Sequence, residues 1–211
     1  VSGAVIRNAF TVSIFRNPMQ EDYMDIYIQS MADLSASPTV LVQTGRDSTV
    51  IALDALMTGF FRGGYLLPYN LSIGEKRIAE IHVKGKTKDG KEVAAVTLFG
   101  YGRIGSAGGK IALSGFSLEI PPDALRKPEL ITIIQTAAEG GNAKIGRCEP
   151  FLDRERFSAG PAALRTAKPM TVSFRLKGDA AGAGIYRLAG DAPEYVGGVV
   201  SNGLITASVA E

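Results

Sequence analysis

The chain contains few side chains that could act as nucleophiles, bases or transition-metal ligands. Its 211 residues include one histidine, His82, and one cysteine, Cys148. A nucleophilic mechanism places a base beside a nucleophile and an orienting acid, and the sequence around His82 offers no such set. We expect His82 to lie on the surface of a strand; the alternative is a contact that responds to pH.

Cys148 has no second cysteine with which to form an intramolecular disulfide or a cysteine-based zinc site. The neighbouring Arg147 would favour the reactive thiolate form. Because no histidine adjoins the pair, we expect an inert thiol, which would link two chains only if it is exposed. The sequence therefore predicts no enzyme activity within these 211 residues.

One glycine motif matches the dinucleotide-binding fingerprint in its letters. Residues 100–105 read Gly-Tyr-Gly-Arg-Ile-Gly and follow an expected strand. In that fingerprint the last glycine opens a helix whose N-terminal amides hold the pyrophosphate. Here residues 106–109 are Ser-Ala-Gly-Gly, a run that breaks helices. We therefore interpret residues 100–109 as a linker between two domains and expect no cofactor.

Acidic residues near expected turns suggest a calcium site at most. Asp22, Asp25 and Asp33 form one group, and Asp47 and Asp54 form another. Calcium takes six to eight oxygens from closely spaced residues, and the chain has no Asp-x-Asp-x-Asp-Gly run. We expect no metal site, and the sequence leaves a calcium ion at the end of a domain as the alternative.

Aromatic residues between positions 59 and 69, together with one in the glycine-rich stretch, form the candidate interaction surface. These residues are Phe60, Phe61, Tyr65, Tyr69 and Tyr101. Aromatic side chains are common in binding surfaces, but they more often pack in a core or between domains. Both interpretations are compatible with the sequence.

The overall composition excludes several classes of protein. The 23 basic and 21 acidic residues give a net charge of +2, which is not typical of a nucleic-acid-binding protein. No run of 18 apolar residues is present, so we expect no membrane-spanning helix. The first residues, Val1-Ser2-Gly3-Ala4, match either a mature N-terminus after removal of a signal peptide or the boundary of a longer sequence.

The elements that must position these residues are short strands, because apolar and polar residues alternate in runs bounded by Gly, Pro, Asn or Asp. In one run, Met24, Ile26 and Ile28 fall on one face. Asp89-Gly90 is the strongest hairpin signal, and residues 123–125 would form a single helical turn. The expected strands cover residues 10–15, 23–29, 39–43, 49–53, 78–87, 92–99, 111–113, 116–120, 130–136, 170–176, 185–188 and 204–209.

Short strands that recur with turn residues at each break are typical of β-sandwiches and barrels. A chain of 211 residues is long enough for one large or two small domains and can bury about 70% of its surface. We therefore predict an all-β protein with two tandem β-sandwich domains, at residues 1–99 and 110–211, joined by the linker at 100–109.

The second half contains a pattern with a known counterpart. Residues 108–113 are Gly-Gly-Lys-Ile-Ala-Leu, and residues 115–125 are Gly-Phe-Ser-Leu-Glu-Ile-Pro-Pro-Asp-Ala-Leu. This strand, glycine turn and aliphatic strand ending in Ile-Pro-Pro-x-Ala-Leu resemble the opening of ZU5-type β-sandwich domains. Further segments are similar to later strands of that family and of its bacterial surface relatives: 157–161, 167–174, 185–188, 194–196 and 203–209.

The first half more loosely resembles a bacterial immunoglobulin-like module. Residues 59–65, residues 78–83 and the Asp89-Gly90 hairpin are similar to the late strands of such modules. Some ZU5-type proteins cleave themselves at His-Phe-Ser, but here Arg156 takes the place of the histidine before Phe157-Ser158, so we expect no self-cleavage. The charged run at residues 153–156 is expected to protect an exposed strand edge.

Together these resemblances imply a bacterial extracellular or cell-envelope protein that acts without catalysis. We expect a structural or adhesion module that works through protein–protein contacts or self-association. In the relatives a further strand follows the last segment, whereas this sequence stops at Glu211. A strand from a neighbouring copy would complete the sheet and build a fibre. The alternative is an accessory β-sandwich region of a larger secreted hydrolase.

Overall fold

The computed structural model describes residues 6–7, 9–20, 22–68, 71–136, 156–160, 164–176, 183–189 and 192–210. Within these ranges the backbone forms strands, turns and loops but no helix, which confirms the expected all-β class. The chain divides into two compact units. Unit 1 comprises Val1–Tyr69, Ile78–Phe99 and Ile134–Ser158, and unit 2 comprises Asn70–Arg77, Gly100–Ile133 and Ala159–Glu211.

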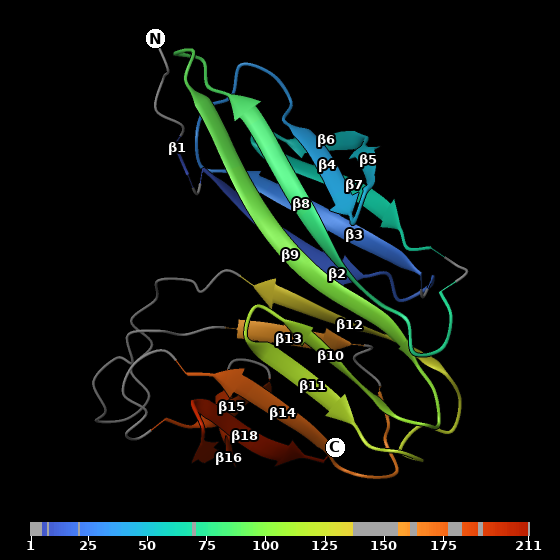
Figure 1. Cartoon of the computed structure of the whole chain (residues 1–211). Coiled ribbons are helices and arrows are strands. Elements are labelled where there is room, and N and C mark those ends of the chain that lie inside the picture. The colour runs from blue at the N-terminus through green and yellow to red at the C-terminus, as the bar shows by residue number, and fades with distance from the viewer. Residues whose placement is uncertain are drawn as a thin grey trace. The chain divides into compact units, whose positions relative to one another are not determined.

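Unit 1 contains a four-stranded antiparallel sheet in the order β2-β3-β7-β6 (Figure 1). Its strands are β2 (Phe10–Arg16), β3 (Tyr23–Ser30), β7 (Phe60–Leu66) and β6 (Leu53–Met57). Met24, Ile26 and Ile28 of β3 point inward and are fully buried, as the alternation predicts. The residues between them lie on the opposite face, because successive side chains of a strand alternate.

A second sheet has seven strands, with the order β13-β12-β9-β8-β4-β5 and with β1 parallel to β9. Its strands are β1 (Ile6–Arg7), β4 (Thr39–Thr44), β5 (Asp47–Ile51), β8 (Lys76–Lys86), β9 (Glu92–Ile104), β12 (Glu129–Thr136) and β13 (Arg156–Gly160). Strands β9 and β12 each supply residues to both units. The predicted division at residues 100–109 stays a prediction.

The core of unit 1 is built from the facing sides of its two sheets. The rings of Tyr65 on β7 and Phe99 on β9 meet edge to face with centroids 6.2 Å apart. The Thr44 hydroxyl on β4 lies 3.4 Å from the Tyr65 hydroxyl. Each large apolar side chain buried here contributes about 1.5–3 kcal/mol. From the seven-stranded sheet, strands β4 and β8 contribute aliphatic residues with 0% exposure: Val40, Ala79, Ile81 and Val83.

The hairpin predicted at Asp89-Gly90 is present between β8 and β9. The Gly90 N–H donates to the Thr87 carbonyl at 2.9 Å, and the Thr87 N–H donates to the Lys91 carbonyl at 2.9 Å. Gly90 has a φ of +86°, a conformation that residues with a Cβ rarely adopt. The turn also has a hydrogen bond from the Thr87 hydroxyl to the Asp89 carboxylate.

The glycine-rich stretch differs from the loop that the sequence led us to expect. Residues 100–104 continue β9, and Tyr101 and Ile104 within them are buried. Gly102 permits this close packing, since a Cβ there would lie 2.9 Å from the Glu75 carbonyl oxygen. A high glycine content is typical of a linker, but at Gly102 of β9 the glycine allows the backbone at Glu75 to approach closely.

Unit 2 contains a five-stranded sheet in the order β10-β11-β14-β18-β17 and a separate β15-β16 hairpin. Its strands are β10 (Gly109–Leu113), β11 (Phe116–Ile120), β14 (Met170–Arg175), β15 (Ile185–Ala189), β16 (Ala192–Gly197), β17 (Val199–Ser201) and β18 (Leu204–Val209). Ile185, Ile205 and Ala207 form one buried cluster, against which Val172 and Phe174 pack.

The segment after β11 forms a turn where a single helical turn was expected. The Ala124 N–H donates to the Pro121 carbonyl at 3.2 Å, and Asp123 has a φ of +58°. A positive φ is incompatible with a right-handed helix. Ala124 and Leu125 are nevertheless buried, so the Ile-Pro-Pro-x-Ala-Leu motif closes the end of β11 with apolar side chains.

Candidate functional site

Three aromatic side chains lie side by side on the outward face of the four-stranded sheet. Phe15 on β2 meets Tyr27 on β3 edge to face, with ring centroids 5.8 Å apart. Phe60 on β7 stacks on the other side of Tyr27 at 5.9 Å with an interplanar angle of 20°. Phe15 is 58% exposed, while Tyr27 and Phe60 are half-buried. The three rings therefore form a solvent-facing strip across neighbouring strands.

Arg62 places a cation beside this strip. In the β3–β7 register Arg62 lies opposite Tyr27, and its guanidinium is 5.9 Å from the centre of the Tyr27 ring. Such an arrangement is a weak cation–π interaction. The Arg62 side chain is 45% exposed, so it faces solvent as well as the ring.

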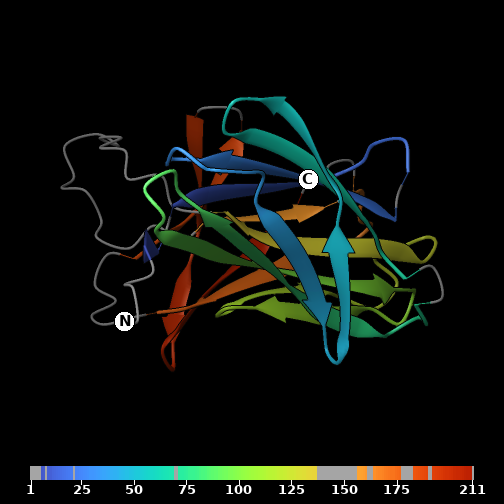
Figure 2. The same cartoon turned by 90° about the horizontal axis from the view of Figure 1, so that it is seen from above.

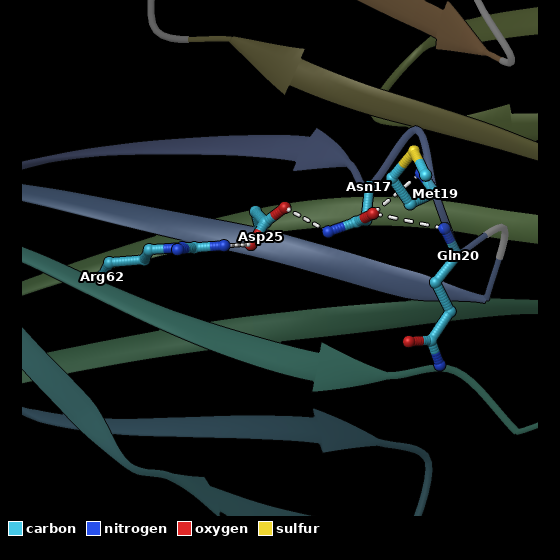
Figure 3. Close-up of polar contacts among 5 residues, drawn as sticks. All are labelled: Asn17, Met19, Gln20, Asp25 and Arg62. Atoms are coloured by element: carbon cyan, nitrogen blue, oxygen red, sulfur yellow. Dashed lines mark hydrogen bonds and ion pairs between the residues drawn. The ribbon is translucent and has the colours of Figure 1, made fainter.

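Asp25 holds the Arg62 guanidinium in place (Figure 3). Its Oδ1 accepts hydrogen bonds from Nη2 of Arg62 at 2.7 Å and from Nε at 3.2 Å. Bonding to the ionised carboxylate raises the pKa of Arg62 above its usual value. Two charge-assisted bonds that converge on one carboxylate oxygen restrict the rotation of the guanidinium. The orientation of Arg62 is thus set by β3, its neighbouring strand.

Asn17 connects this ion pair to the β2–β3 turn (Figure 3). Its Nδ2 donates to Oδ2 of Asp25 at 3.1 Å, and its Oδ1 accepts the backbone N–H groups of Met19 and Gln20 at 2.9 and 3.2 Å. An asparagine that caps its own turn is a common turn-forming device. Here the same side chain also fixes a carboxylate, so the turn and the ion pair stabilise each other.

Two exposed apolar side chains extend the strip. Met57, opposite Phe60 in the β6–β7 register, is 67% exposed, and Leu66, on the Arg62 side of β7, is 52% exposed. We call this set the aromatic face; it comprises Phe15, Met57, Tyr27, Phe60, Arg62 and Leu66. It combines exposed apolar area, aromatic rings and one fixed cation on a single sheet, which is a composition suited to binding another molecule.

Of the five aromatic residues predicted as an interaction surface, only Phe60 belongs to the aromatic face. Phe61, Tyr65 and Tyr101 are 6%, 8% and 0% exposed, so they pack in the cores, the alternative that the sequence left open. Each of the three occupies an inward-facing position of its strand. Tyr69 lies outside the described residues.

Sequence reasoning did not select Phe15, Tyr27 or Arg62 for this surface. The available signal was alternation: Tyr27 falls between buried Ile26 and Ile28 and so had to face outward. The sequence does not show that β7 pairs with β3. This pairing places Phe60 and Arg62 next to Tyr27.

The other singled-out residues are dispersed. His82 lies on β8, 27% exposed by side chain, with Nε2 3.0 Å from Oε2 of Glu80, in agreement with a histidine on a strand surface. Cys148 and residues 153–155 lie outside the described part of the chain. Among the described residues, no three histidine, cysteine, aspartate or glutamate side chains are placed to hold a metal ion.

A second polar cluster lies within unit 2. Oε1 of Glu75 accepts hydrogen bonds from Nη2 and Nε of Arg77 at 2.5 and 2.8 Å, and Oε2 accepts the Ser72 N–H at 3.1 Å. The Ser72 bond and then the Arg77 bond lower the pKa of Glu75. The Glu75 carbonyl also accepts the Arg103 N–H at 3.1 Å. This cluster fixes residues 72–77 to the end of β9 and is structural.

Comparison with known proteins yields no relative: no family model, no curated protein and no solved structure matches the chain. Among the described residues, no helix has the length and apolar character needed to cross a membrane.

Proposed function

We propose that this protein is a non-catalytic structural or adhesion module that acts through protein–protein contacts, including contacts between its own copies. The observation that carries the proposal is the aromatic face on the β2-β3-β7-β6 sheet. Residues at the centres of protein interfaces that contribute most to binding are enriched in tyrosine, tryptophan and arginine. Tyr27 and Arg62 lie at the middle of this face with apolar side chains around them.

The rigidity of the face supports binding without a large loss of entropy. Arg62 is held by two hydrogen bonds to Asp25, and Tyr27 is held between Phe15 and Phe60. An immobilised side chain costs about 0.5–1.5 kcal/mol when a complex forms, and pre-ordered side chains avoid most of that cost. A protein partner with exposed apolar and acidic groups fits this surface, because Arg62 is its fixed cation.

We further propose an extracellular or cell-envelope location. The resemblance of residues 108–125 to ZU5-type domains supports this location, because such modules occur in bacterial surface proteins. The looser resemblance of residues 59–65, residues 78–83 and the Asp89-Gly90 hairpin to bacterial immunoglobulin-like modules supports it as well. Cell fractionation with an antibody against the chain tests it. Recovery in the cytoplasmic fraction alone would contradict this part of the proposal.

Site-specific photocrosslinking tests the binding surface directly. A photoreactive phenylalanine analogue replaces Phe15, which is 58% exposed on the aromatic face, or Ile78, which is 49% exposed on β8. With envelope and secreted fractions of the source cells, we expect one defined protein adduct from position 15 only. Arg62→Glu in the same protein should abolish that adduct. Equal adducts at both positions, or none at position 15, would refute the aromatic face as a binding surface.

The full open reading frame separates this function from that of an accessory region of a larger secreted hydrolase. A reading frame that encodes tandem β-domains, or this chain alone, agrees with the adhesion proposal. A catalytic domain in the same frame would instead assign the aromatic face to substrate or domain contacts of that enzyme.

A further inference from the structure

Strands β5 and β6 follow each other in the sequence and form one open edge of unit 1. β5 ends the order of the seven-stranded sheet and β6 ends the order of the four-stranded sheet, with Ala52 between them (Figure 2). In the described part of the chain no strand is paired with the outer side of either one. Residues 47–51 and 53–57 are therefore two consecutive edge strands, separated by Ala52, whose outer sides are open to another strand.

This edge has only part of the usual protection against pairing with another strand. Natural edge strands are protected by lysine and other charged residues, by proline, by bulges or by short length. Residues 47–57 contain no lysine or proline, although they include Asp47 and Asp54, and the β6–β7 register shifts between Ala55 and Met57. Val50, Leu56 and Met57 are 68%, 49% and 67% exposed. By contrast, the edge strand β10 carries Lys110, and the edge strand β17 has only three residues. The β5–β6 edge therefore has neither the lysine of β10 nor the short length of β17.

We propose that a second copy of this chain pairs with the β5–β6 edge, antiparallel and about a two-fold axis at Val50. A two-fold contact must be self-complementary. In this register Arg46 of each copy lies opposite Asp54 of the other, Ser48 lies opposite Ala52, and the two Val50 residues face each other. Arg46 and Asp54 are both exposed, so two opposite-charge pairs form across the contact.

Neighbouring registers lack this complementarity. An axis between Val50 and Ile51 would place Asp47 of each copy opposite Asp54 of the other, which sets like charges against each other. An axis at Ile51 would place Arg46 opposite Leu56. Of these three registers, only the one with its axis at Val50 places Arg46 of each copy opposite Asp54 of the other.

This inference rests on the proposed function, because it identifies the partner in self-association and the strand that it uses. A two-fold contact closes at two copies and does not by itself extend into a fibre. It also leaves the three rings and Arg62 of the aromatic face free for a different protein, because these residues lie on β2, β3 and β7 and not on the pairing edge.

Sedimentation velocity of the full chain over a concentration series tests the pairing. We expect a monomer–dimer equilibrium in the unaltered protein. Arg46→Asp or Asp54→Arg alone puts like charges opposite each other at two places, and each should weaken the dimer about tenfold. The double variant Arg46→Asp/Asp54→Arg restores both pairs in reverse and should recover the original dissociation constant.

Ile78→Lys provides the matched control, since it places a charge on an exposed apolar position of β8 away from the edge, and it should leave the dimer unchanged. Circular dichroism confirms that each variant is folded. A strictly monomeric parent protein, or a double variant as weak as the single ones, would overturn the inference. If the protein is monomeric but still forms the photocrosslinked adduct at position 15, the pairing is refuted and the aromatic face is not. If the protein is dimeric but forms no adduct at position 15, the aromatic face is refuted and the pairing is not.

Discussion

Asp25 is the residue that organises the aromatic face. It is 7% exposed, accepts two hydrogen bonds from Arg62 and one from Asn17, and so links the β2–β3 turn to β7. A nearly buried carboxylate is tolerated in a sheet only when its oxygens are satisfied in this way. Removal of the carboxylate would leave the Asn17 amide and the Arg62 guanidinium without this acceptor.

Asp25→Ala should therefore lower the free energy of unfolding by about 1–3 kcal/mol, since the hydrogen bonds from Arg62 and Asn17 to an ionised carboxylate are lost. Glu92→Ala is the matched control, because Glu92 is an exposed carboxylate on β9 and lies outside the ion pair. Its effect should stay within about 0.5 kcal/mol. Urea unfolding of both variants gives the comparison, and equal losses would contradict the role of Asp25.

Glu75 gives the protein an acid-sensitive contact. Its lowered pKa, caused by the Ser72 N–H and the Arg77 guanidinium, means that the ionised form favours the folded state. That stabilisation is present above the usual carboxyl pKa of 4.5 and is lost as the pH falls through the lowered value. Glu75→Gln should therefore cost stability at pH 7 but progressively less at lower pH. Urea titrations along a pH series measure the difference, and a difference that is constant with pH would contradict this account.

At the scale of elements, β9 shows how glycines can serve a strand. Gly100 and Gly102 are both in β9, but a Cβ at Gly102 would lie 2.9 Å from the Glu75 carbonyl oxygen, whereas at Gly100 its nearest neighbour would be 3.6 Å away. A Cβ only 2.9 Å from a carbonyl oxygen would force the backbone to shift, whereas a nearest neighbour at 3.6 Å is an ordinary van der Waals contact.

Gly102→Ala should accordingly destabilise the protein by about 1–3 kcal/mol, as expected for overpacking, while Gly100→Ala should be close to neutral or slightly stabilising. Thermal unfolding of the two variants under the same conditions gives the comparison. If both alanines were tolerated equally, the close approach of residue 75 to β9 would be refuted.

The strands themselves were largely predictable, because alternation and turn residues are local signals. Met24, Ile26 and Ile28 are buried as expected, and Gly90 forms the expected turn. The sequence predicts a loop at residues 100–104, where β9 continues, because a glycine in a strand and a glycine in a linker look alike until the neighbouring backbone is known.

The candidate site was less accessible to prediction. Phe60 was selected, but Phe15, Tyr27 and Arg62 were not, since their proximity depends on the β2-β3-β7 order, which joins segments far apart in the sequence. The alternation of apolar and polar residues in β3 shows that Tyr27 faces outward. Only the pairing of β3 with β2 and β7 shows which side chains lie beside it.

At the scale of the whole molecule, the two compact units do not follow a single cut in the sequence. Unit 1 includes Ile134–Ser158 as well as residues before position 100, and unit 2 includes Asn70–Arg77. Each unit is therefore assembled from separate stretches of chain, which raises the sequence distance over which its contacts form.

A fragment of residues 1–99 should consequently be less stable than the same region in the full chain. It lacks Ile134–Ser158 of its own unit, and β9 ends in it five residues early. We expect a lower urea midpoint and a less cooperative transition, measured by circular dichroism on both proteins. A fragment that unfolds cooperatively at the midpoint of the full chain would instead support the predicted independent domain.

The position of Tyr27 has an optical consequence. The protein contains seven tyrosines and no tryptophan, so its intrinsic ultraviolet fluorescence comes from tyrosine. Tyr27 lies half-buried between two phenylalanine rings, close to Arg62. A partner that docks there with a tryptophan would receive excitation energy from Tyr27. Binding could then be followed without any label, and the contribution lost in Tyr27→Phe would report on this face rather than on the other six tyrosines.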